Sequence, residues 1–153
     1  MKRWPAGTMR IVIPSSEGYE KTVAAAVRVF AAGTGLSETR AEDLGTAVSE
    51  ACLNAIEHGN RGLADAAVVV TVTHHRNELL VEVRDCGRSR LEPDVALTRP
   101  DLAERVAGRV PPRGWGIYLM RQLVDAVEFV AAPRHNLTRL TVYLSSRKER
   151  EHD

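Results

Sequence analysis

The chain has 153 residues, a formal net charge of +1 and 44% hydrophobic residues. This length suggests one domain with a sizeable core, and the ordinary apolar content excludes wholesale disorder. The small net charge gives no general attraction to nucleic acid or membranes. We expect no signal peptide and no membrane span, because no stretch approaches the roughly 20 apolar residues that a span needs. With two cysteines outside any metal-type spacing, the sequence predicts a soluble, cytoplasmic protein.

The first half of the chain predicts one strand, two helices and a pair of strands. The first strand ends at a proline, and glycines end both helices. The later strands are rich in β-branched residues, and the turn His75-Arg76-Asn77 between them predicts a hairpin. The expected ranges are 9–13 (strand), Ser15 or Ser16 to about 32 (helix), Ser37 or Thr39 to His58 (helix), 67–73 (strand) and 79–84 (strand).

The second half begins with a long segment in which prolines interrupt any periodic pattern, and such segments are usually functional or disordered. A helix and two closing strands follow it. The expected ranges are 87–114 (irregular), 115–127 (helix), 128–132 and 137–144 (strands), within a domain at 9–145 between a loose N-terminus (1–8) and a charged tail (146–153). This order predicts an α+β fold, a two-layer sandwich with a mixed, mostly antiparallel sheet and helices on one face.

Three polar residues share one face of the second predicted helix: Glu50, Asn54 and His58. Steps of four residues at about 100° each drift by only roughly 40°, so the three side chains point the same way. They lie at the edge of the apolar face, from which polar groups can line a pocket. A carboxylate and an amide one turn apart can hold a base and a hard metal ion. Read alone, such a row more often marks an ordinary amphipathic helix.

Two further segments carry glycines at structural junctions. In Asp85-Cys86-Gly87 a strand ends in a carboxylate, which can accept a hydrogen bond from an exocyclic amine such as that of adenine. In Arg113-Gly114-Trp115-Gly116-Ile117 two glycines open a helix, where exposed N–H groups attract phosphate. Each segment alone is more often a plain turn or loop, but their order along the chain, each at a structural junction, favours a site.

The three segments resemble the N, G1 and G2 boxes of the GHKL (Bergerat-fold) ATP-binding superfamily. Within it, they are most similar to the anti-sigma-factor serine/threonine kinases of bacterial partner switching. The stretch from Glu50 to His58 resembles their Glu-Ala-x-x-Asn-Ala-x-x-His. The stretch from Arg113 to Leu119, with the later Leu123-Val124-Asp125, resembles their Arg-Gly-x-Gly-φ-x-Leu followed by Leu-φ-Asp. The similarity spans nearly the whole chain and implies the Bergerat fold.

The resemblance implies a site for ATP and Mg²⁺. Glu50 would act as the catalytic base, and Asn54 would hold the Mg²⁺ ion. Asp85 would read the adenine amino group, Gly87 would leave room for the ring, and the glycines of the last segment would cradle phosphates through backbone N–H groups. The ATP lid would span 88–113. The implied nucleotide-binding residues are Asn54, His58, Asp85, Gly87, Arg113, Gly114, Trp115, Gly116 and Ile117.

The sequence departs from the superfamily pattern at two places. Ser89 stands where the G1 box has its second glycine, and Arg139-Leu140 stands where many members have Gly-Thr before the last strand. Thr138 and Thr141 are the candidates to replace that threonine. His58 matches its box and is equally typical of a helix C-terminus, where the helix dipole favours it.

The resemblance implies an anti-sigma factor that is also an ATP-dependent protein serine kinase. Such a protein sequesters a sigma factor, phosphorylates a serine of an anti-anti-sigma (STAS-domain) antagonist, and usually forms a homodimer, without touching nucleic acid or membrane. An alternative of a different class is a non-catalytic Bergerat-fold module that acts only by sequestering its partner. Intact Glu50 and Asn54 favour the kinase, whereas the altered boxes favour the module. The detached ATP domain of a sensor histidine kinase is a weaker interpretation.

Overall fold

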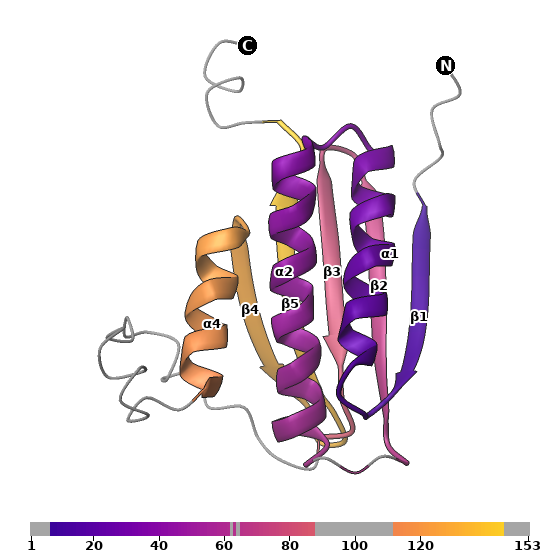
Figure 1. The fold of residues 1–153 in the computed structure, drawn as a ribbon, viewed down its shortest axis with the longest axis vertical. Coiled ribbons are helices and arrows are strands. Elements are labelled where there is room, and N and C mark those ends of the chain that lie inside the picture. Colours follow the sequence, from indigo (N-terminus) through magenta and orange to yellow (C-terminus); the bar gives the residue numbers. More distant parts are fainter. Residues whose placement is uncertain (1–6, 62, 64, 88–111, 146–153) are drawn as a thin grey trace.

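The structure, a computed structural model, describes residues 7–61, 63, 65–87 and 112–145, with only the backbone described for 112–114. A five-stranded sheet in the order β1-β2-β3-β5-β4 carries the helices on one face (Figure 1). The elements are β1 (Thr8–Pro14), α1 (Tyr19–Gly33), α2 (Glu38–Asn54), the π-helical turn η1 (Ala55–Gly59), β2 (Ala67–His75), β3 (Glu78–Arg84), α4 (Pro112–Leu123), β4 (Ala126–Ala131) and β5 (Asn136–Tyr143). The predicted two-layer α+β sandwich is confirmed, and every pairing between these strands is antiparallel.

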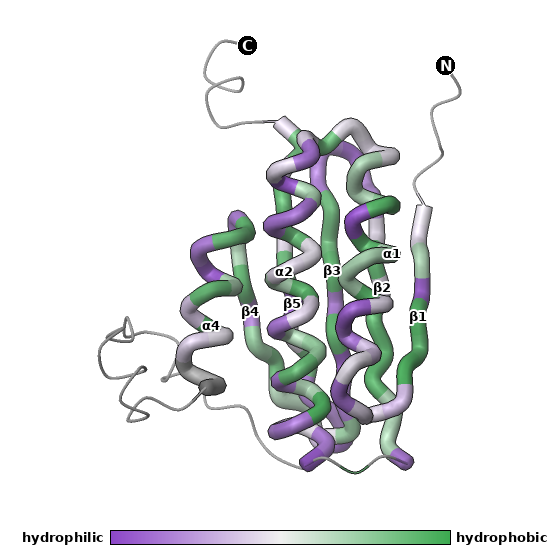
Figure 2. The backbone as a smooth tube through the Cα atoms, viewed as in Figure 1, coloured by the Kyte–Doolittle hydropathy of each residue, from purple (hydrophilic) through white to green (hydrophobic). Residues whose placement is uncertain are grey.

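The core lies between the sheet and the helices. Along β2, Val68, Val70 and Val72 are fully buried while the residues between them are half-buried, which is the two-residue period of a strand with one covered face. From the helix side, Leu44 and Val48 of α2 are also fully buried. Figure 2 shows hydrophobic residues concentrated along the middle of β2 and β3, behind the helices. Burial of this apolar layer holds α2 against the sheet.

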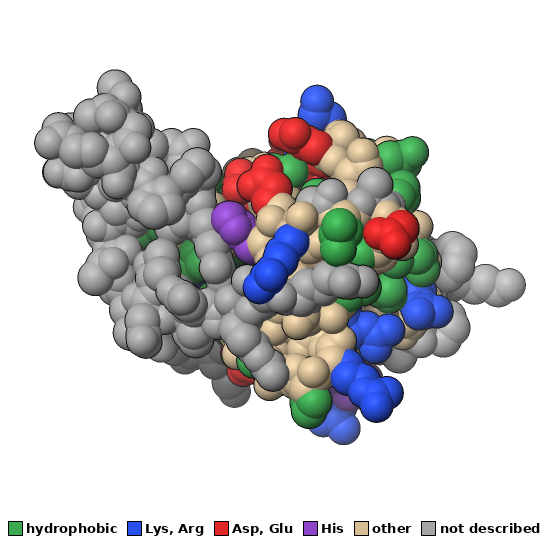
Figure 3. Space-filling model, turned by 90° about the horizontal axis from the view of Figure 1, so that it is seen from below, with side chains coloured by type: hydrophobic (Ala, Val, Ile, Leu, Met, Phe, Trp, Pro, Cys, Tyr) green, Lys and Arg blue, Asp and Glu red, His purple; other side chains and the backbone are tan. Residues whose placement is uncertain are grey.

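Strand direction brings the candidate segments to one end of the molecule. β1 and β3 end there, β2 and β5 begin there, and the same end holds the last turn of α2 and the first turn of α4 (the lower end in Figure 1). Seen from this end, the described surface carries both acidic and basic side chains, and neither sign covers it (Figure 3). We call this part of the molecule the lower end.

The first helix begins later than the sequence predicted, because its N-cap is Gly18 and not a serine. Gly18 has a φ of 111°, and no side chain caps the helix at this position. Its N–H instead donates to Glu20 Oε2 at 2.6 Å, which satisfies one of the unpaired N–H groups at the helix start. The prediction of a cap at Ser15 or Ser16 is therefore wrong. The alternative of a cap at Ser37 for α2 is confirmed, since its Oγ accepts from the Arg40 N–H at 3.3 Å.

The second helix does not continue as an α-helix to His58 as predicted. α2 ends at Asn54, and η1 follows as a wider turn in which the Asn60 N–H donates to the Ala55 carbonyl at 2.8 Å. π-helical turns are rare in proteins, and many of those that occur lie at functional sites. The α-helical face shared by Glu50 and Asn54 therefore stops one turn before His58.

The last helix begins and ends earlier than the predicted range of 115–127. α4 begins at Pro112, a position at which proline's missing N–H costs nothing. After α4 the Asp125 N–H donates to the Thr141 carbonyl at 3.0 Å, so the chain has already joined the sheet. Val127, predicted to lie on the helix, belongs to β4 and pairs with Leu140 of β5. Strand pairing here overrides the helical spacing of the apolar residues.

Parts of the predicted organisation fall outside the described residues. They include most of the expected lid (88–111, with Ser89), residues 1–6 of the N-terminus and the tail at 146–153. The end of the expected lid, at 112–113, belongs to α4. Among the residues that the structure describes, no helix is long and apolar enough to cross a membrane.

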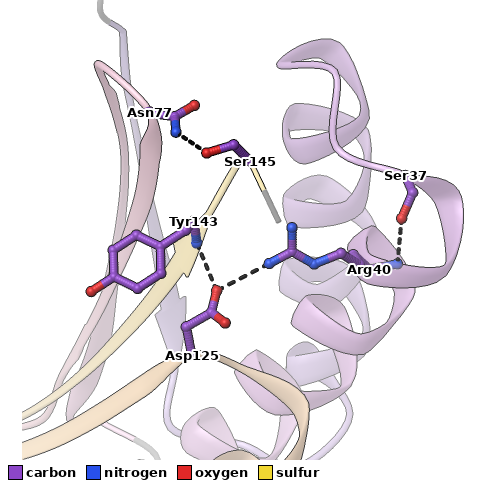
Figure 4. Close-up of polar contacts among 6 residues, drawn as sticks. All are labelled: Ser37, Arg40, Asn77, Asp125, Tyr143 and Ser145. Carbon is purple, nitrogen blue, oxygen red and sulfur yellow. Dashed lines mark hydrogen bonds and ion pairs between the residues drawn. The ribbon is translucent and has the colours of Figure 1, made fainter. Parts of the chain in front are cut away.

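Asp125 connects α2, α4 and β5 at the end of the sheet opposite the lower end. Its Oδ2 accepts a hydrogen bond from Arg40 Nη2 at 3.0 Å and another from the Tyr143 N–H at 2.7 Å (Figure 4). One carboxylate oxygen therefore joins the first turn of α2 to the last strand. This contact fixes the far end of the helical layer on the sheet.

Replacing Asp125 with alanine is expected to lower the free energy of unfolding by about 1–2 kcal/mol, because an ion pair and a hydrogen-bond acceptor are both lost. For a chain of this size the loss corresponds to a fall in Tm of roughly 3–6 °C. Arg40→Ala removes only the half-exposed ion pair and should cost at most about 1 kcal/mol. Thermal unfolding followed by circular dichroism measures both variants, and equal losses would contradict a role for the Tyr143 contact.

Candidate functional site

Asn54 is the last residue of α2 and is buried at the lower end, with 6% of its surface exposed. Its Nδ2 is buried and has no hydrogen-bond partner within the described part of the chain. A buried polar group without a partner costs about 1–3 kcal/mol, so native structures rarely keep one without a functional reason. Rotating the side-chain amide by half a turn would put its oxygen where Nδ2 now lies. Amide oxygens are ligands for Mg²⁺. The position therefore fits a residue that holds a metal ion or a ligand.

Glu50, one turn earlier on the same helix, lies against the start of α4. A Cβ built on Gly116 would lie 2.7 Å from Glu50 Oε2, which is closer than side-chain atoms approach. In a helix that begins at Pro112, Gly116 lies beyond the unpaired N–H groups of the first turn. The lack of a side chain at Gly116 makes room for Glu50.

Asp85 follows β3 directly and is buried, with 5% of its surface exposed. Its Oδ1 accepts hydrogen bonds from the Gly87 N–H at 2.6 Å and from Asn136, through N at 3.3 Å and Nδ2 at 3.2 Å. Burial raises the pKa of this carboxyl above its usual value, and the hydrogen bonds from Gly87 and Asn136 oppose part of that rise. None of these donors reaches Oδ2, so that oxygen is the one left for a further donor.

The two glycines beside Asp85 are required by close approach. A Cβ on Gly59, the last residue of η1, would overlap Asp85 Oδ2. Gly87 has a φ of 67°, and a Cβ there would lie 2.7 Å from the backbone nitrogen of His135. Gly59 therefore lets the end of the π-helical turn pack on Asp85, and Gly87 lets the loop after β3 pack on the connection between β4 and β5.

The remaining predicted site residues have different surroundings. His58 is half-buried in η1, and Trp115 is half-buried with its ring centroid 5.7 Å from that of Tyr118. Ile117 is 1% exposed and belongs to the hydrophobic core. Arg113 and Gly114 lie in the first turn of α4, and their side-chain positions are outside the described part of the structure.

The start of β5, not Arg139-Leu140, supplies the polar groups next to Asp85. Arg139 is paired with Glu82 at 3.1 Å, and Leu140 is fully buried in the core. Thr138 is 4% exposed and pairs with Val83, on the same face of the sheet as Asp85. Thr141 pairs with Leu80 on the other face. Of the two candidate threonines, only Thr138 therefore lies beside the site.

Sequence reasoning missed two buried asparagines at the lower end, Asn60 and Asn136, which are both 0% exposed. Asn136 holds Asp85 Oδ1, and Asn60 accepts a hydrogen bond from the Cys86 N–H at 2.7 Å. The available signal was their position, since Asn60 lies two residues after the segment that ends at His58 and Asn136 precedes the predicted strand at 137–144. Asparagines at such places are usually turn residues, so the signal is weak.

The two cysteines at the lower end differ in reactivity. Cys52 is fully buried in α2, and burial, with Glu20 nearby, raises the pKa of its thiol to about 12. Cys86 is exposed beside Asp85. At about pH 8 a thiol reagent is therefore expected to label one cysteine in the folded protein and both after denaturation, because only exposed thiolate reacts. Cys86→Ser should abolish the native label, and labelling that leaves ATP affinity unchanged would argue that Cys86 lies away from the nucleotide.

Comparisons with known sequences identify the family. Residues 13–142 match the family described as the histidine kinase-like ATPase domain. The serine-protein kinase RsbW of Bacillus pumilus is 30% identical over 125 residues, which cover 78% of this chain and 75% of the relative. The anti-sigma F factor of Bacillus thuringiensis is 31% identical over 110 residues, covering 68% of this chain and 70% of the relative.

Solved structures agree in fold. The RsbU and RsbW domains of a Mycobacterium tuberculosis protein match with a TM-score of 0.64 and 21% identity, over 94% of this chain and 34% of that longer chain. A chain of the SiaB–SiaC complex from Pseudomonas aeruginosa matches with a TM-score of 0.59 and 14% identity, over 88% of each chain. This chain belongs to the histidine kinase-like ATPase family, within the group that includes the RsbW serine-protein kinases and the anti-sigma F factors.

Proposed function

We propose that this protein is an ATP-dependent protein serine/threonine kinase that also acts as an anti-sigma factor. The observation that carries the proposal is the buried amide nitrogen of Asn54, which has no partner among the described residues and lies one turn after Glu50, the residue that packs against Gly116 of α4. A metal-binding amide next to a carboxylate base is the pair of groups that phosphoryl transfer needs. The names of the sequence relatives, a serine-protein kinase and an anti-sigma F factor, support the same function.

The residues at the lower end take separate roles in this proposal. Asn54 would hold Mg²⁺, which when bound neutralises phosphate charge. Glu50 would accept the proton of the attacking serine hydroxyl. Asp85, held by Asn136 and Gly87 through Oδ1, would accept a hydrogen bond from the adenine amino group through Oδ2. The proposed phosphate contacts come from His58, Arg113, Gly114 and Trp115.

The proposed partners follow from the relatives' names and from the motif resemblance. The protein would sequester a sigma factor and would phosphorylate a serine of an anti-anti-sigma STAS-domain protein, which competes for it. We propose a homodimer as the working form. A protein that binds its sigma factor but neither binds ATP nor transfers phosphate would instead be a sequestering module.

The first test is a Mg-ATP titration followed by Trp115 fluorescence, in a Trp4→Phe background that leaves a single tryptophan. Trp115 lies between the glycines of α4, so we expect bound nucleotide to change its emission. Asn54→Ala is expected to weaken Mg-ATP binding by at least about tenfold, because even residues that only support a metal ligand have effects of this size. The variant should remain folded, since the lost Nδ2 makes no hydrogen bond among the described residues.

The same titration in EDTA separates the metal from the nucleotide. Removing Mg²⁺ should bring the wild-type affinity to the level of Asn54→Ala and should leave the variant unchanged. Transfer of the γ-phosphate to a serine of a STAS-domain protein then tests the kinase activity. Absence of ATP binding by fluorescence and calorimetry would contradict the proposed enzyme and leave only the sequestering module.

A further inference from the structure

Asn60 joins three separate segments of the chain at the lower end. Its Nδ2 donates to Ser15 Oγ, after β1, and to the Ala67 carbonyl, at the start of β2, both at 3.1 Å. Its Oδ1 accepts from the Cys86 N–H at 2.7 Å, directly after Asp85. We call Asn60 and these three partners the Asn60 clamp. All three hydrogen bonds form in a side chain that is 0% exposed.

The clamp and Asn136 hold the two sides of the loop that carries Asp85. Asn136 fixes the carboxylate itself, through Oδ1. Asn60 fixes the peptide that follows, through the Cys86 N–H. Gly59, the residue just before Asn60, lies against Oδ2. A shift of Asn60 therefore moves both the peptide after Asp85 and the surface on which the free carboxylate oxygen lies.

Only an amide side chain satisfies all three contacts at this position. The Ala67 carbonyl needs a donor, the Cys86 N–H needs an acceptor, and an amide of this length carries both. A carboxylate would keep the acceptor and lose the donor. A serine hydroxyl is shorter and cannot reach the partners on opposite sides. The asparagine is therefore specified by its contacts as well as by its size.

We propose that Asn60 is a positioning residue that sets the direction of Asp85 Oδ2 and thereby the selectivity of the nucleotide site for adenine. The inference rests on the proposed ATP-binding function. Asn60 acts through the peptide of Cys86 and through Gly59, and it does not itself touch the nucleotide. Its loss should weaken recognition of the base while leaving recognition of the triphosphate intact.

The test compares ATP with inosine triphosphate, which carries a carbonyl oxygen in place of the adenine amino group and a proton on the neighbouring ring nitrogen N1. The two nucleotides share their phosphates and ribose, so the ratio of their dissociation constants reports the base contact alone. Wild type should prefer ATP by at least about tenfold, the effect of a hydrogen bond to a charged group. Asn60→Ser is expected to reduce this preference by at least about fivefold, since the acceptor for Cys86 is lost.

Two matched variants separate positioning from simple stabilisation. Ser15→Ala removes a clamp contact on the side away from Asp85, so it should lower Tm and keep the ATP preference. Asn60→Asp keeps an acceptor for the Cys86 N–H and loses the donors, so it should restore the preference that Asn60→Ser loses. Both are read by the same pair of titrations, with circular dichroism melting to measure stability.

The outcomes divide cleanly. A preference that falls in Asn60→Ser and is kept in Ser15→Ala and Asn60→Asp supports the inference. An unchanged preference in folded Asn60→Ser, or an equal fall in Ser15→Ala, overturns it. If Asn60→Ser does not fold, Asn60→Asp decides, since loss of its preference overturns the inference and retention supports it. Wild type that binds ATP without any preference overturns the inference alone, whereas wild type that binds no ATP overturns the proposed function as well.

Discussion

Glu50→Gln is expected to lower the rate of phosphoryl transfer by about 10²–10⁴-fold, the usual contribution of a general base. Glutamine keeps the length and shape of the side chain and removes its ability to take a proton. Shape matters at this position, because Glu50 Oε2 lies only 2.7 Å from where a Cβ on residue 116 would be. The change therefore tests proton transfer without opening or closing the contact between α2 and α4.

Single-turnover phosphorylation of a STAS-domain substrate measures this rate, and the fluorescence titration measures ATP affinity in parallel. The affinity should stay near the wild-type value, because the proposed base acts on the substrate hydroxyl and not on the nucleotide. Glu42→Gln is the matched control, since Glu42 is an exposed glutamate of the same helix. A wild-type rate in Glu50→Gln would remove Glu50 from the proposed mechanism. A joint loss of rate and affinity would show that its charge serves nucleotide binding.

Much of the candidate site could be predicted from the sequence, because the positions of its residues follow from the periods of one helix and one strand. Glu50 and Asn54 are four residues apart on a helix, and the structure keeps them on one face of α2. Asp85 was placed at a strand end because the alternating pattern of β3 stops at Arg84. Such relations involve neighbours in the chain, so helical and strand periods are enough to find them.

The contacts that hold the site together depend on residues far apart in the chain. Asn60 meets Ser15 and Cys86, and Asn136 meets Asp85 across 51 positions. No periodic pattern links such residues, and the strand order that brings them together is a property of the whole sheet. A contact between distant residues also sets the end of α4. The Asp125 N–H donates to the Thr141 carbonyl at a point where the spacing of apolar residues predicted more helix.

The π-helical turn η1 shows how a local pattern can be right in type and wrong in detail. The spacing of His58 from Asn54 is helical, and the chain does continue to turn there. The turn widens, however, where Asn60 is drawn into its contacts with β1 and β2 and Gly59 packs on Asp85. Tertiary contacts thus reshape the last turn, and the residue that permits this packing is a glycine.

Gly59→Ala is expected to destabilise the fold by about 1–3 kcal/mol, the usual cost of an added group in a packed site. The new Cβ would overlap the carboxylate of Asp85, so either Asp85 or η1 must move. The backbone of Gly59 does not have a positive φ, so alanine is opposed by space alone. Moving Asp85 should also reduce ATP affinity, by at least about tenfold, because the hydrogen bond to the adenine amino group depends on its direction.

Gly33→Ala is the control for this prediction, because Gly33 also lies in a helical segment and a Cβ there would meet nothing within 4 Å. That variant should be neutral or more stable by up to about 1 kcal/mol, the difference in helix propensity. Denaturant unfolding and the ATP titration measure both variants. The double variant Gly59→Ala/Asp85→Ser tests the cause, since a smaller side chain at 85 gives the methyl group room. Stability that recovers in the double variant, while ATP affinity stays low, would assign the clash and the loss of binding to the same carboxylate. If Gly59→Ala alone kept full affinity, the expected displacement of Asp85 would be contradicted, and η1 would be the part that moves.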